Sequence, residues 1–301
     1  MSDEEKCTEG EFSEKFEELR WNLLNAYRPT LESAPQAFLL GGQSGAGKTT
    51  LHKIVHRRLD GNGISINGDD YRKFHPRFLE LQRIYGDEAV NYTAPWAGRM
   101  TEALIDSLSR IEYNLVIEGT LRTAEVPLKT AELLRQRSYG VSLALMAVKP
   151  EISLVSCQIR YEEIRVAGTT PRATDPAHHN KIIDQIVSNL GVLEASGMFD
   201  EIALYDRSQT RLFPREGAGD SAEKALRTIL FDPWTPEERR HYNELKAKLN
   251  YLKTKVKPAL RYQRRAGFKP RGGRTEPSPT AVFILARMEI PRDSREMRYT
   301  L

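Results

Sequence analysis

Hydrophobic residues recur along this chain with two spacings, one typical of buried strands and the other typical of helices. Short apolar runs predict strands at 37–40, 64–67, 113–117, 141–148 and 202–205. Between these runs, apolar residues stand three or four positions apart and predict helices after residue 50, at 93–111, from 127, at 152–166 and at about 180–196. Strands that alternate with helices predict an α/β fold, in which a parallel sheet carries helices on both faces.

Further helices are predicted on either side of this alternating core. Residues 11–27 carry one apolar stripe, and we expect this helix to pack against the core, although a partner could compete for its position. Residues 221–231 and 236–255 predict two helices after the last strand. Beyond Pro258, glycine, proline and arginine replace the apolar periodicity, which favours a disordered tail. The predicted segments are an N-terminal helical segment (1–36), a core domain (37–232), a C-terminal helix (233–257) and a basic tail (258–301) with an apolar stretch at 281–290.

A phosphate-binding loop lies between the first strand and the first core helix. Its sequence matches the pattern GxxxxGK[ST], and the flanking strand and helix supply the context that this pattern requires. Glycines let backbone N–H groups turn towards an anion, and the helix N-terminus adds partial positive charge. We therefore expect a P-loop NTPase-type sheet that binds a nucleotide with Mg²⁺, in which Lys48 reaches the β- and γ-phosphates and Thr49 ligates the metal. The nucleotide-binding residues are Gly42, Gln43, Ser44, Gly45, Ala46, Gly47, Lys48, Thr49 and Thr50.

Such a loop identifies a nucleotide but not a reaction, so the polar residues at other strand ends decide between functions. Asp69 follows the second predicted strand. Two interpretations of Asp69 are open. In small-molecule kinases with this loop a carboxylate here can accept the proton of the attacking hydroxyl, but aspartate after glycine is also a common helix cap. Asp70, next in the chain, is the better cap candidate.

Three polar residues, Glu118, Thr120 and Arg122, follow the third predicted strand. A carboxylate that leaves an apolar strand is costly to bury unless it is bonded. Glu118 could accept from sugar hydroxyls, organise Mg²⁺ through water, or form an internal pair with an arginine. Glu102 adds a second carboxylate on the 93–111 helix, where a solvated position is the simplest interpretation.

Two arginines and a pair of histidines complete the candidates. Arg160 and Arg172 flank the turn 168–170, and a lid arginine can neutralise the charge that spreads over the γ-phosphate oxygens. Asp175, His178 and His179 could suggest a metal site. We do not expect one, because adjacent histidines do not easily share one ligand face and no further ligand is apparent.

Composition narrows the class of protein. Of the 301 residues, 40% are hydrophobic and 29% charged, as in soluble globular proteins. There is no run of about eighteen apolar residues that would predict a membrane span, and the acidic N-terminus is not a secretory signal.

Cys7 and Cys157 lack metal-binding spacing, so we expect a reducing cytoplasm. The net charge of +4 is uneven, since nine Lys or Arg and no acidic residue lie between 253 and 275, and this tail could contact nucleic acid or anionic surfaces.

Several spaced motifs together resemble the zeta toxins, the kinase toxins of toxin–antitoxin systems, and among them the PezT type. The resemblance covers about 38–231, and its ordered motifs are far more specific than the phosphate loop alone. In chain order they are GGQSGAGKTT, Ile66-Asn67-Gly68-Asp69, Phe74-His75-Pro76, Met100-Thr101-Glu102, YNLVIEGTLRT, Val126-Pro127, RYEE and Pro171-Arg172-Ala173-Thr174.

The resemblance implies a kinase that uses ATP·Mg²⁺ to phosphorylate the 3′-hydroxyl of the amino sugar of UDP-N-acetylglucosamine, which drains a cell-wall precursor. It implies that Lys48 is the phosphate-loop lysine and Asp69 the catalytic base, and that Arg160 and Arg172 are lid arginines. It also implies an antitoxin that blocks the ATP site with an inserted helix. The implied substrate-binding positions are Glu102, Glu118, Thr120, Arg122 and Thr130.

The sequence departs from the family pattern in three places. Asn67-Gly68 precede Asp69 where zeta toxins can carry Asp-Asn, so one acidic contact is absent. The lid loop between Arg160 and Arg172 is slightly short, and the tail has no recognised counterpart. Two other functions stay open: another small-molecule or polynucleotide kinase, and a nucleotide-binding module with little catalysis and no dependence on Asp69.

Overall fold

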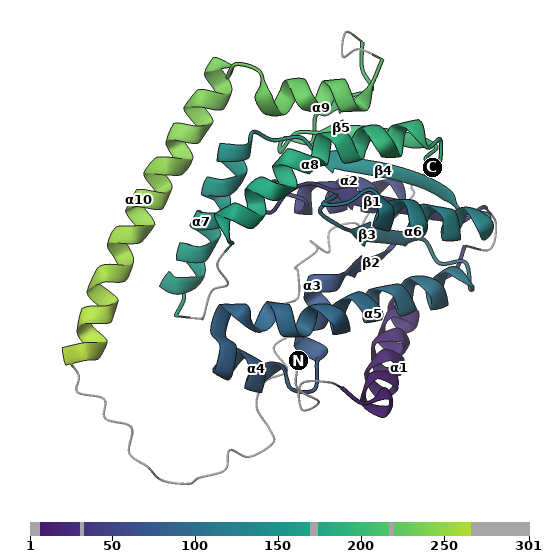
Figure 1. Ribbon diagram of the computed structural model, residues 1–301, viewed down its shortest axis with the longest axis horizontal. Coiled ribbons are helices and arrows are strands. Elements are labelled where there is room, and N and C mark those ends of the chain that lie inside the picture. The colour runs from purple at the N-terminus through teal and green to yellow at the C-terminus, as the bar shows by residue number, and fades with distance from the viewer. Residues whose placement is uncertain (1–6, 31–32, 169–173, 217–219, 266–301) are drawn as a thin grey trace, which may run out of the picture. The chain divides into compact units, whose positions relative to one another are not determined.

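A six-stranded sheet with the order β2-β3-β1-β4-β5-β6 lies at the centre of the computed structural model, which describes residues 7–30, 33–168, 174–216 and 220–265 (Figure 1). Strands β1 to β5 are parallel, and β6 runs antiparallel to β5. The predicted parallel α/β sheet with flanking helices is thereby confirmed. The strands are β1 (Gln36–Gly41), β2 (Ile64–Asn67), β3 (Leu115–Glu118), β4 (Gly140–Met146), β5 (Glu201–Tyr205) and β6 (Arg211–Phe213).

Each face of the sheet has its own hydrophobic core, because successive side chains of a strand point to opposite sides. On one face Leu39 and Ile117 pack with α1 (Glu9–Ala26), α5 (Ala89–Ser109), α6 (Glu125–Gln136), α8 (Pro176–Ala195) and α9 (Ala222–Phe231). On the other face Phe38 and Val116 pack with α2 (Thr49–Arg58), the start of α7 (Pro150–Val166) and α10 (Pro236–Arg265). Burial on both faces explains why the strands are nearly continuous apolar runs in the sequence.

Helix α1 packs against α5, as the apolar stripe of residues 11–27 predicts. Phe12 and Leu19 are buried in the core, and the Phe12 ring meets the edge of Trp96 with centroids 5.3 Å apart. The helix begins two residues earlier than predicted, behind an N-cap at Thr8. A capping box forms there, since Glu11 accepts from the Thr8 N–H and the Thr8 hydroxyl accepts from the Glu11 N–H.

The prediction missed one strand and placed the starts of two helices four residues too late. The strand at 202–205 is not the last, because the three-residue strand β6 follows it and is too short to show periodicity. Helices α5 and α8 begin at Ala89 and Pro176, four residues before their predicted starts. For α8 the local chemistry explains the start: the Asp175 carboxylate accepts from the Ala177 N–H at 2.9 Å, and proline suits the first helical position.

Residues 258–265, predicted to be disordered tail, are helical as the end of α10. A proline inside a helix costs about 3 kcal/mol, but it does not forbid helix on both sides, and the alanine, leucine and arginines after Pro258 favour it. Residues Met1–Ala259 form one compact unit. The tail from 266, with the apolar stretch 281–290, lies outside the described residues. Among the described residues, no helix is both long and apolar enough to span a membrane.

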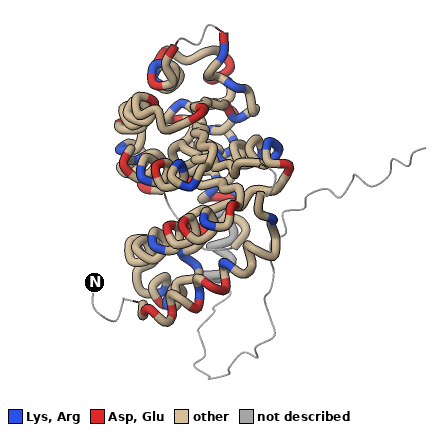
Figure 2. Tube along the Cα trace, turned by 90° about the vertical axis from the view of Figure 1, so that its right-hand side faces the viewer, with Lys and Arg blue, Asp and Glu red and all other residues tan. Residues whose placement is uncertain are grey.

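Short helices connect β2 to α5 in the described chain. They are α3 (Gly68–Tyr71), η2 (Arg72–Phe74), α4 (Phe78–Tyr85) and η3 (Gly86–Glu88). Figure 2 shows acidic and basic residues interspersed over the described helices. The stretch with nine basic and no acidic residues begins only near the end of α10.

Buried polar groups fasten the loop after β1 to α7 and α8. Gln43 Nε2 donates to Val148 O at 2.8 Å and to Ser153 Oγ at 3.2 Å. Ser153 Oγ also lies 2.9 Å from Nε2 of the fully buried His179. Because Ser153 donates its own proton to Pro150 O, both nitrogens act as donors to its oxygen. The arrangement therefore requires a His179 with its proton on Nε2.

The same loop touches α7 directly at Gly45, whose φ of +75° is in the left-handed region. A Cβ at this position would lie 2.1 Å from Ser153 O and 2.6 Å from Cys157 Sγ. Only glycine allows both the backbone angle and the close approach of the loop to the helix.

We predict that Gly45→Ala lowers the free energy of unfolding by about 2–4 kcal/mol, because it adds left-handed strain and a backbone overlap. Gly98→Ala is the matched control, since a Cβ at Gly98 in α5 meets nothing within 4 Å. It should raise the stability by about 0.5–1 kcal/mol, as expected for glycine in a helix. Urea unfolding of the two variants measures both values, and equal stabilities would contradict the described contact.

Stability should also fall in mild acid because of His179. Burial lowers the pKa of His179 below its usual value of 6.5, against the opposing effect of its bond to Asn180. The unfolded chain therefore binds a proton at a higher pH than the folded chain. The stabilisation is complete above about pH 6.5 and is lost as the pH falls towards the folded pKa, by at most about 1.4 kcal/mol per pH unit.

Urea unfolding at pH 7.5 and 5.5 tests this expectation. His179→Gln should lose less stability between the two pH values than the wild type does. Burial also lowers the pKa values of His56 and His75, so part of the loss should remain in the variant. The exposed His178 serves as the control, and His178→Gln should behave like the wild type. An unchanged pH dependence in His179→Gln would contradict the assignment.

Candidate active site

The phosphate-binding loop joins β1 to α2, as the motif predicts. Gly42 and Gly47 have φ values of +136° and +99°, which glycine adopts readily. Lys48 precedes α2, and its Nζ donates to Gly42 O at 3.0 Å across the loop. Thr49, at the first position of α2, is exposed. The loop thus ends at a helix N-terminus, where partial positive charge favours an anion.

The strand register brings three chain segments to one edge of the sheet. Leu40 of β1 and Asn67 of β2 both pair with Glu118 of β3. The phosphate loop, Glu118 and Asp69 therefore leave adjacent strands at the same level. In open parallel sheets, ligands bind at this carboxyl edge.

The Lys48 ammonium lies among the predicted charged residues. Its side chain is 12% exposed, and its Nζ lies 3.7 Å from Glu118 Oε1. Burial lowers the pKa of Lys48, while the negative charges of Glu118 and Asp69 oppose that shift and the positive charge of Arg160 adds to it. Of these residues, Glu118 is in direct ion-pair range of Lys48, and Asp69 follows the neighbouring strand β2.

Glu118 has a second partner, His52, which the sequence analysis missed. His52 stands one turn after Lys48 on α2, and its Nε2 lies 2.8 Å from Glu118 Oε2. Burial alone would raise the pKa of Glu118, but the bond to His52 and the charge of Lys48 outweigh it and hold that pKa below its usual value. The suggested internal Glu–Arg pair is wrong, because the partners of Glu118 are a histidine and a lysine.

Neither Asp69 nor Asp70 caps a helix. The N-cap of α3 is Asn67, whose side-chain oxygen accepts from the Asp69 N–H at 3.1 Å. The Asp69 carboxylate is 58% exposed and lies 2.8 Å from Arg72 Nε. Burial raises the pKa of Asp70, and the charges of Glu118 and Asp69 act in the same direction, whereas those of Lys73 and His52 oppose it. The capping role predicted for Asp70 is wrong, because Asn67 supplies the cap.

The segment after β3 has a strained backbone. Leu121, between the predicted site residues Thr120 and Arg122, is buried with a φ of +54°. This angle is unfavourable for a bulky side chain and persists only when its surroundings hold it. The side-chain amide of Asn189 on α8 donates to Leu121 O at 2.9 Å. The exposed Arg122 is thereby held at the end of β3.

The remaining predicted residues lie in several places. Glu102 is exposed on α5, as the solvated interpretation expects. Thr130 donates its hydroxyl to Val126 O at 3.0 Å within α6. Arg160 is exposed on α7. Arg172 lies outside the described residues.

Arg207, after β5, is a second residue that the sequence analysis missed. Its Nε donates to Ala46 O at 3.1 Å, and its Nη2 donates to Gly45 O and to Ser156 Oγ. Burial lowers the pKa of Arg207, but a guanidinium stays charged at neutral pH. Arg207 therefore links the phosphate loop to Ser156 of α7 through hydrogen bonds. A lone arginine in a short loop gives no sequence signal for that role.

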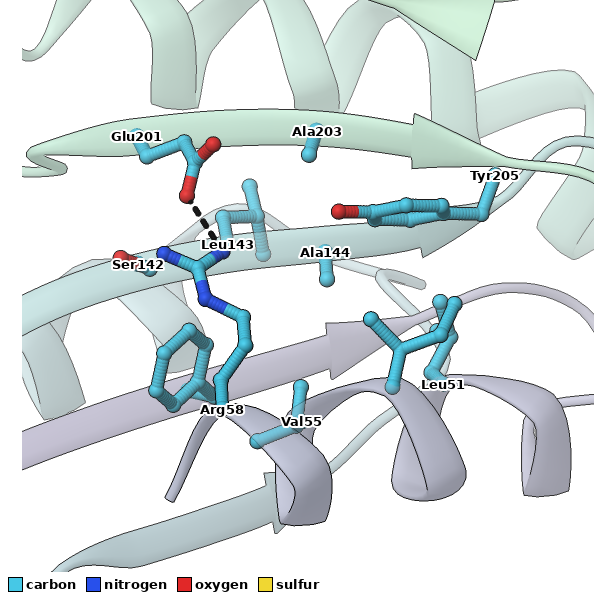
Figure 3. A pocket seen from close by; sticks show the side chains of 11 residues that line it. Leu51, Val55, Arg58, Ser142, Leu143, Ala144, Glu201, Ala203 and Tyr205 are labelled. Carbon is cyan, nitrogen blue, oxygen red and sulfur yellow. Dashed lines mark hydrogen bonds and ion pairs between the residues drawn. The ribbon is translucent and has the colours of Figure 1, made fainter. Parts of the chain in front are cut away.

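A small cavity on the α2 face of the sheet is a packing gap (Figure 3). Its volume is about 10 Å³, which is room for about one water molecule. Arg58 and Glu201, 2.6 Å apart, lie at its end towards the starts of β4 and β5. It is separate from the charged residues around Lys48. An open groove of about 220 Å³ lies between α7 and α10, lined by residues that include Cys157 and Lys253.

Comparisons with known proteins agree with this geometry. Toxin PezT of Streptococcus pneumoniae serotype 4 is 44% identical over 219 residues, which cover 72% of this chain and 87% of the relative. A toxin zeta of Streptococcus agalactiae is 38% identical over 207 residues, 68% of this chain and 71% of the relative. A solved chain of the PezAT chromosomal toxin–antitoxin system of Streptococcus pneumoniae is 39% identical with a TM-score of 0.75, covering 82% of this chain and 98% of that chain.

A more distant structure, the AvrRxo1-ORF1:-ORF2 complex, shares only the fold, with 14% identity and a TM-score of 0.50 over 80% of this chain and 88% of that chain. The sequence profile of the family described as "Zeta toxin" matches residues 23–218, more than half of the chain. The chain belongs to the zeta toxin family.

Proposed function

We propose that this protein is the toxin of a toxin–antitoxin pair and that it is a kinase. In this proposal it transfers the γ-phosphoryl group of ATP to the 3′-hydroxyl of the amino sugar of UDP-N-acetylglucosamine, which withdraws a cell-wall precursor. The observation that carries the proposal is that Lys48 and Glu118 lie 3.7 Å apart at the edge of the sheet where Asp69 leaves the adjacent strand β2. Phosphoryl transfer depends mainly on such positioning and on charge stabilisation.

ATP with Mg²⁺ fits the residues of the loop. Gly42, Gly45 and Gly47 have positive φ values in the turn before α2, and the Lys48 ammonium reaches back across this turn to Gly42 O at 3.0 Å. The exposed Thr49 hydroxyl is the candidate metal ligand. Glu118, which lies 3.7 Å from Lys48, is the candidate to hold Mg²⁺ through a water molecule. When bound, ATP supplies the phosphoryl group and Mg²⁺ neutralises charge on the phosphate oxygens.

The other roles follow from position and from family membership. The exposed Asp69 accepts the proton of the sugar hydroxyl, and Arg72 orients its carboxylate at 2.8 Å. Arg160, whose charge acts on Lys48, and Arg172 neutralise the transferred group. Substrate contacts are assigned to Glu102, Glu118, Thr120, Arg122 and Thr130.

We also propose an antitoxin that covers the ATP site. The support is family membership, together with the solved PezAT relative, whose title describes a toxin–antitoxin system. A protein that binds the phosphate loop would exclude ATP by occupying the same surface.

Product analysis tests the kinase proposal. The purified chain is incubated with ATP, Mg²⁺ and a panel of UDP-sugars, and each sugar is examined by mass spectrometry. We expect UDP-N-acetylglucosamine to gain one phosphoryl group. If ATP binds but no UDP-sugar gains mass, the alternatives of another acceptor or of a binding module with little catalysis take precedence.

Asp69→Asn separates the proposed catalytic base from a structural role. Asparagine keeps the size of the side chain but loses its basicity, and removal of a general base lowers the rate by about 10² to 10⁴. The affinity for ATP should change little, because Asp69 is assigned to the acceptor hydroxyl. The measurements are phosphorylation rate, ATP binding and melting temperature.

Lys48→Ala is the comparison for this variant. It removes the cation assigned to the β- and γ-phosphates, so turnover should fall by orders of magnitude in a folded protein and ATP binding should weaken as well. A rate within a few-fold of wild type in Asp69→Asn would rule out the base role, and Glu118 would become the next candidate. Normal turnover of Lys48→Ala would exclude this loop as the phosphate site.

Truncation after Lys255 should leave the kinase activity unchanged. Among the described residues, Leu249 and Leu252 of α10 pack against the hydrophobic side chains of α7, and both remain in the truncated chain. A folded but inactive truncated protein would show that the tail belongs to the site. If the tail contacts DNA or anionic lipid, truncation should abolish a binding that is sensitive to salt.

A further inference from the structure

Two histidines and a serine form a hydrogen-bonded chain that ends on Glu118, and the proposed roles do not use it. His56 Nε2 lies 2.9 Å from Ser65 Oγ, and Ser65 Oγ lies 3.4 Å from His52 Nδ1. His52 Nε2 then lies 2.8 Å from Glu118 Oε2. One set of donors satisfies all three contacts: His56 donates to Ser65, Ser65 to His52, and His52 to the carboxylate. The imidazole of His52 is thus held from both of its nitrogens.

Glu118 divides its two oxygens between two partners. Oε2 is in hydrogen-bond contact with His52, whereas Oε1 is 3.7 Å from Lys48 Nζ, beyond a direct hydrogen bond. The three side chains are only 12–20% exposed. At a poorly solvated site an ammonium and a carboxylate attract each other strongly, so a direct contact would be favoured unless something holds them apart. Lys48 instead donates to Gly42 O at 3.0 Å.

We propose that His52 is a positioning residue that acts through Glu118. It holds the carboxylate away from Lys48, so that the ammonium stays available for the β- and γ-phosphates of a nucleotide. Without this bond Glu118 closes from 3.7 Å to direct hydrogen-bond contact with Lys48, and a nucleotide then has to break a tighter, poorly solvated ion pair before it binds. The inference rests on the proposed nucleotide site, but it does not depend on the identity of the acceptor.

Two substitutions of His52 test the contacts of its two ring nitrogens separately. His52→Asn keeps a polar group near the Nδ1 position, within reach of Ser65, but is too short to reach Glu118. His52→Gln carries its amide nitrogen to about the Nε2 position and restores a donor to the carboxylate. His56→Asn is the matched control on the same helix face, since it loses the contact with Ser65 and leaves Glu118 untouched.

Calorimetric titration with the ATP analogue AMP-PNP in Mg²⁺ buffer, without any sugar, provides the measurement. His52→Asn should bind about tenfold more weakly than wild type, which corresponds to about 1.4 kcal/mol. We expect His52→Gln and His56→Asn to remain within about threefold of wild type. Melting temperatures are recorded for each variant, because a purely structural role would change stability and leave affinity unchanged.

A double-mutant cycle shows whether His52 acts through Glu118. In Glu118→Gln the side chain is neutral and cannot trap Lys48, so adding His52→Asn should cause no further loss of AMP-PNP affinity. An equal loss in both backgrounds would overturn the inference, as would wild-type affinity of His52→Asn. Failure of the wild type to bind AMP-PNP would overturn the proposed function, and this inference with it.

Discussion

The buried ammonium of Lys48 is the constraint around which the functional edge of this protein is built. A charge that is 12% exposed is costly unless negative charge or hydrogen-bond acceptors surround it. In the structure the acceptors are Gly42 O and, at a longer distance, Glu118, with the charge of Asp69 also near enough to act on it. A phosphate group would satisfy the ammonium better than these partners do. This arrangement is the physical basis of the anion site that we propose at this edge.

The rest of the fold keeps this arrangement rigid. Gly45 rests on the α7 backbone, Gln43 is bonded to the segment after β4, and Arg207 holds two carbonyls of the loop. These contacts fix the conformation of the loop as part of the fold, so the proposed anion would meet a preformed backbone. Leu121 is held in the same way. Its unfavourable φ of +54° is stabilised by the burial of its side chain and by the hydrogen bond from Asn189 of α8. Contacts from α7, α8 and Arg207 thus hold the backbone at this edge of the sheet in one conformation.

Sequence patterns were sufficient for the fold because they reflect burial directly. Strands covered on both faces are continuous apolar runs, and the phosphate-loop motif imposes its own strand–helix context. Residues at strand ends, such as Asp69 and Glu118, could also be identified, since register brings such ends together. The three-residue β6 and the continuation of α10 through Pro258 carry too little pattern to be predicted.

What the sequence concealed are partnerships between distant residues. His52 and Glu118 lie 66 positions apart, and a histidine on a helix face has no spacing that reveals its partner. Arg207 contacts carbonyl groups, which every residue carries, so no sequence feature marks its targets. Several polar side chains near the start of α3 could cap it, and sequence alone does not show which one does. In the structure the Asn67 side chain accepts from the Asp69 N–H, so the Asp69 carboxylate does not act as the cap.

The central proposal is that this edge transfers a phosphoryl group to one sugar hydroxyl. Nuclear magnetic resonance of the product made from UDP-N-acetylglucosamine, ATP and Mg²⁺ tests that claim most directly. We expect a new phosphomonoester whose phosphorus couples to the proton on carbon 3 of the amino sugar. Phosphate released to water alone, or attached at another carbon, would contradict it.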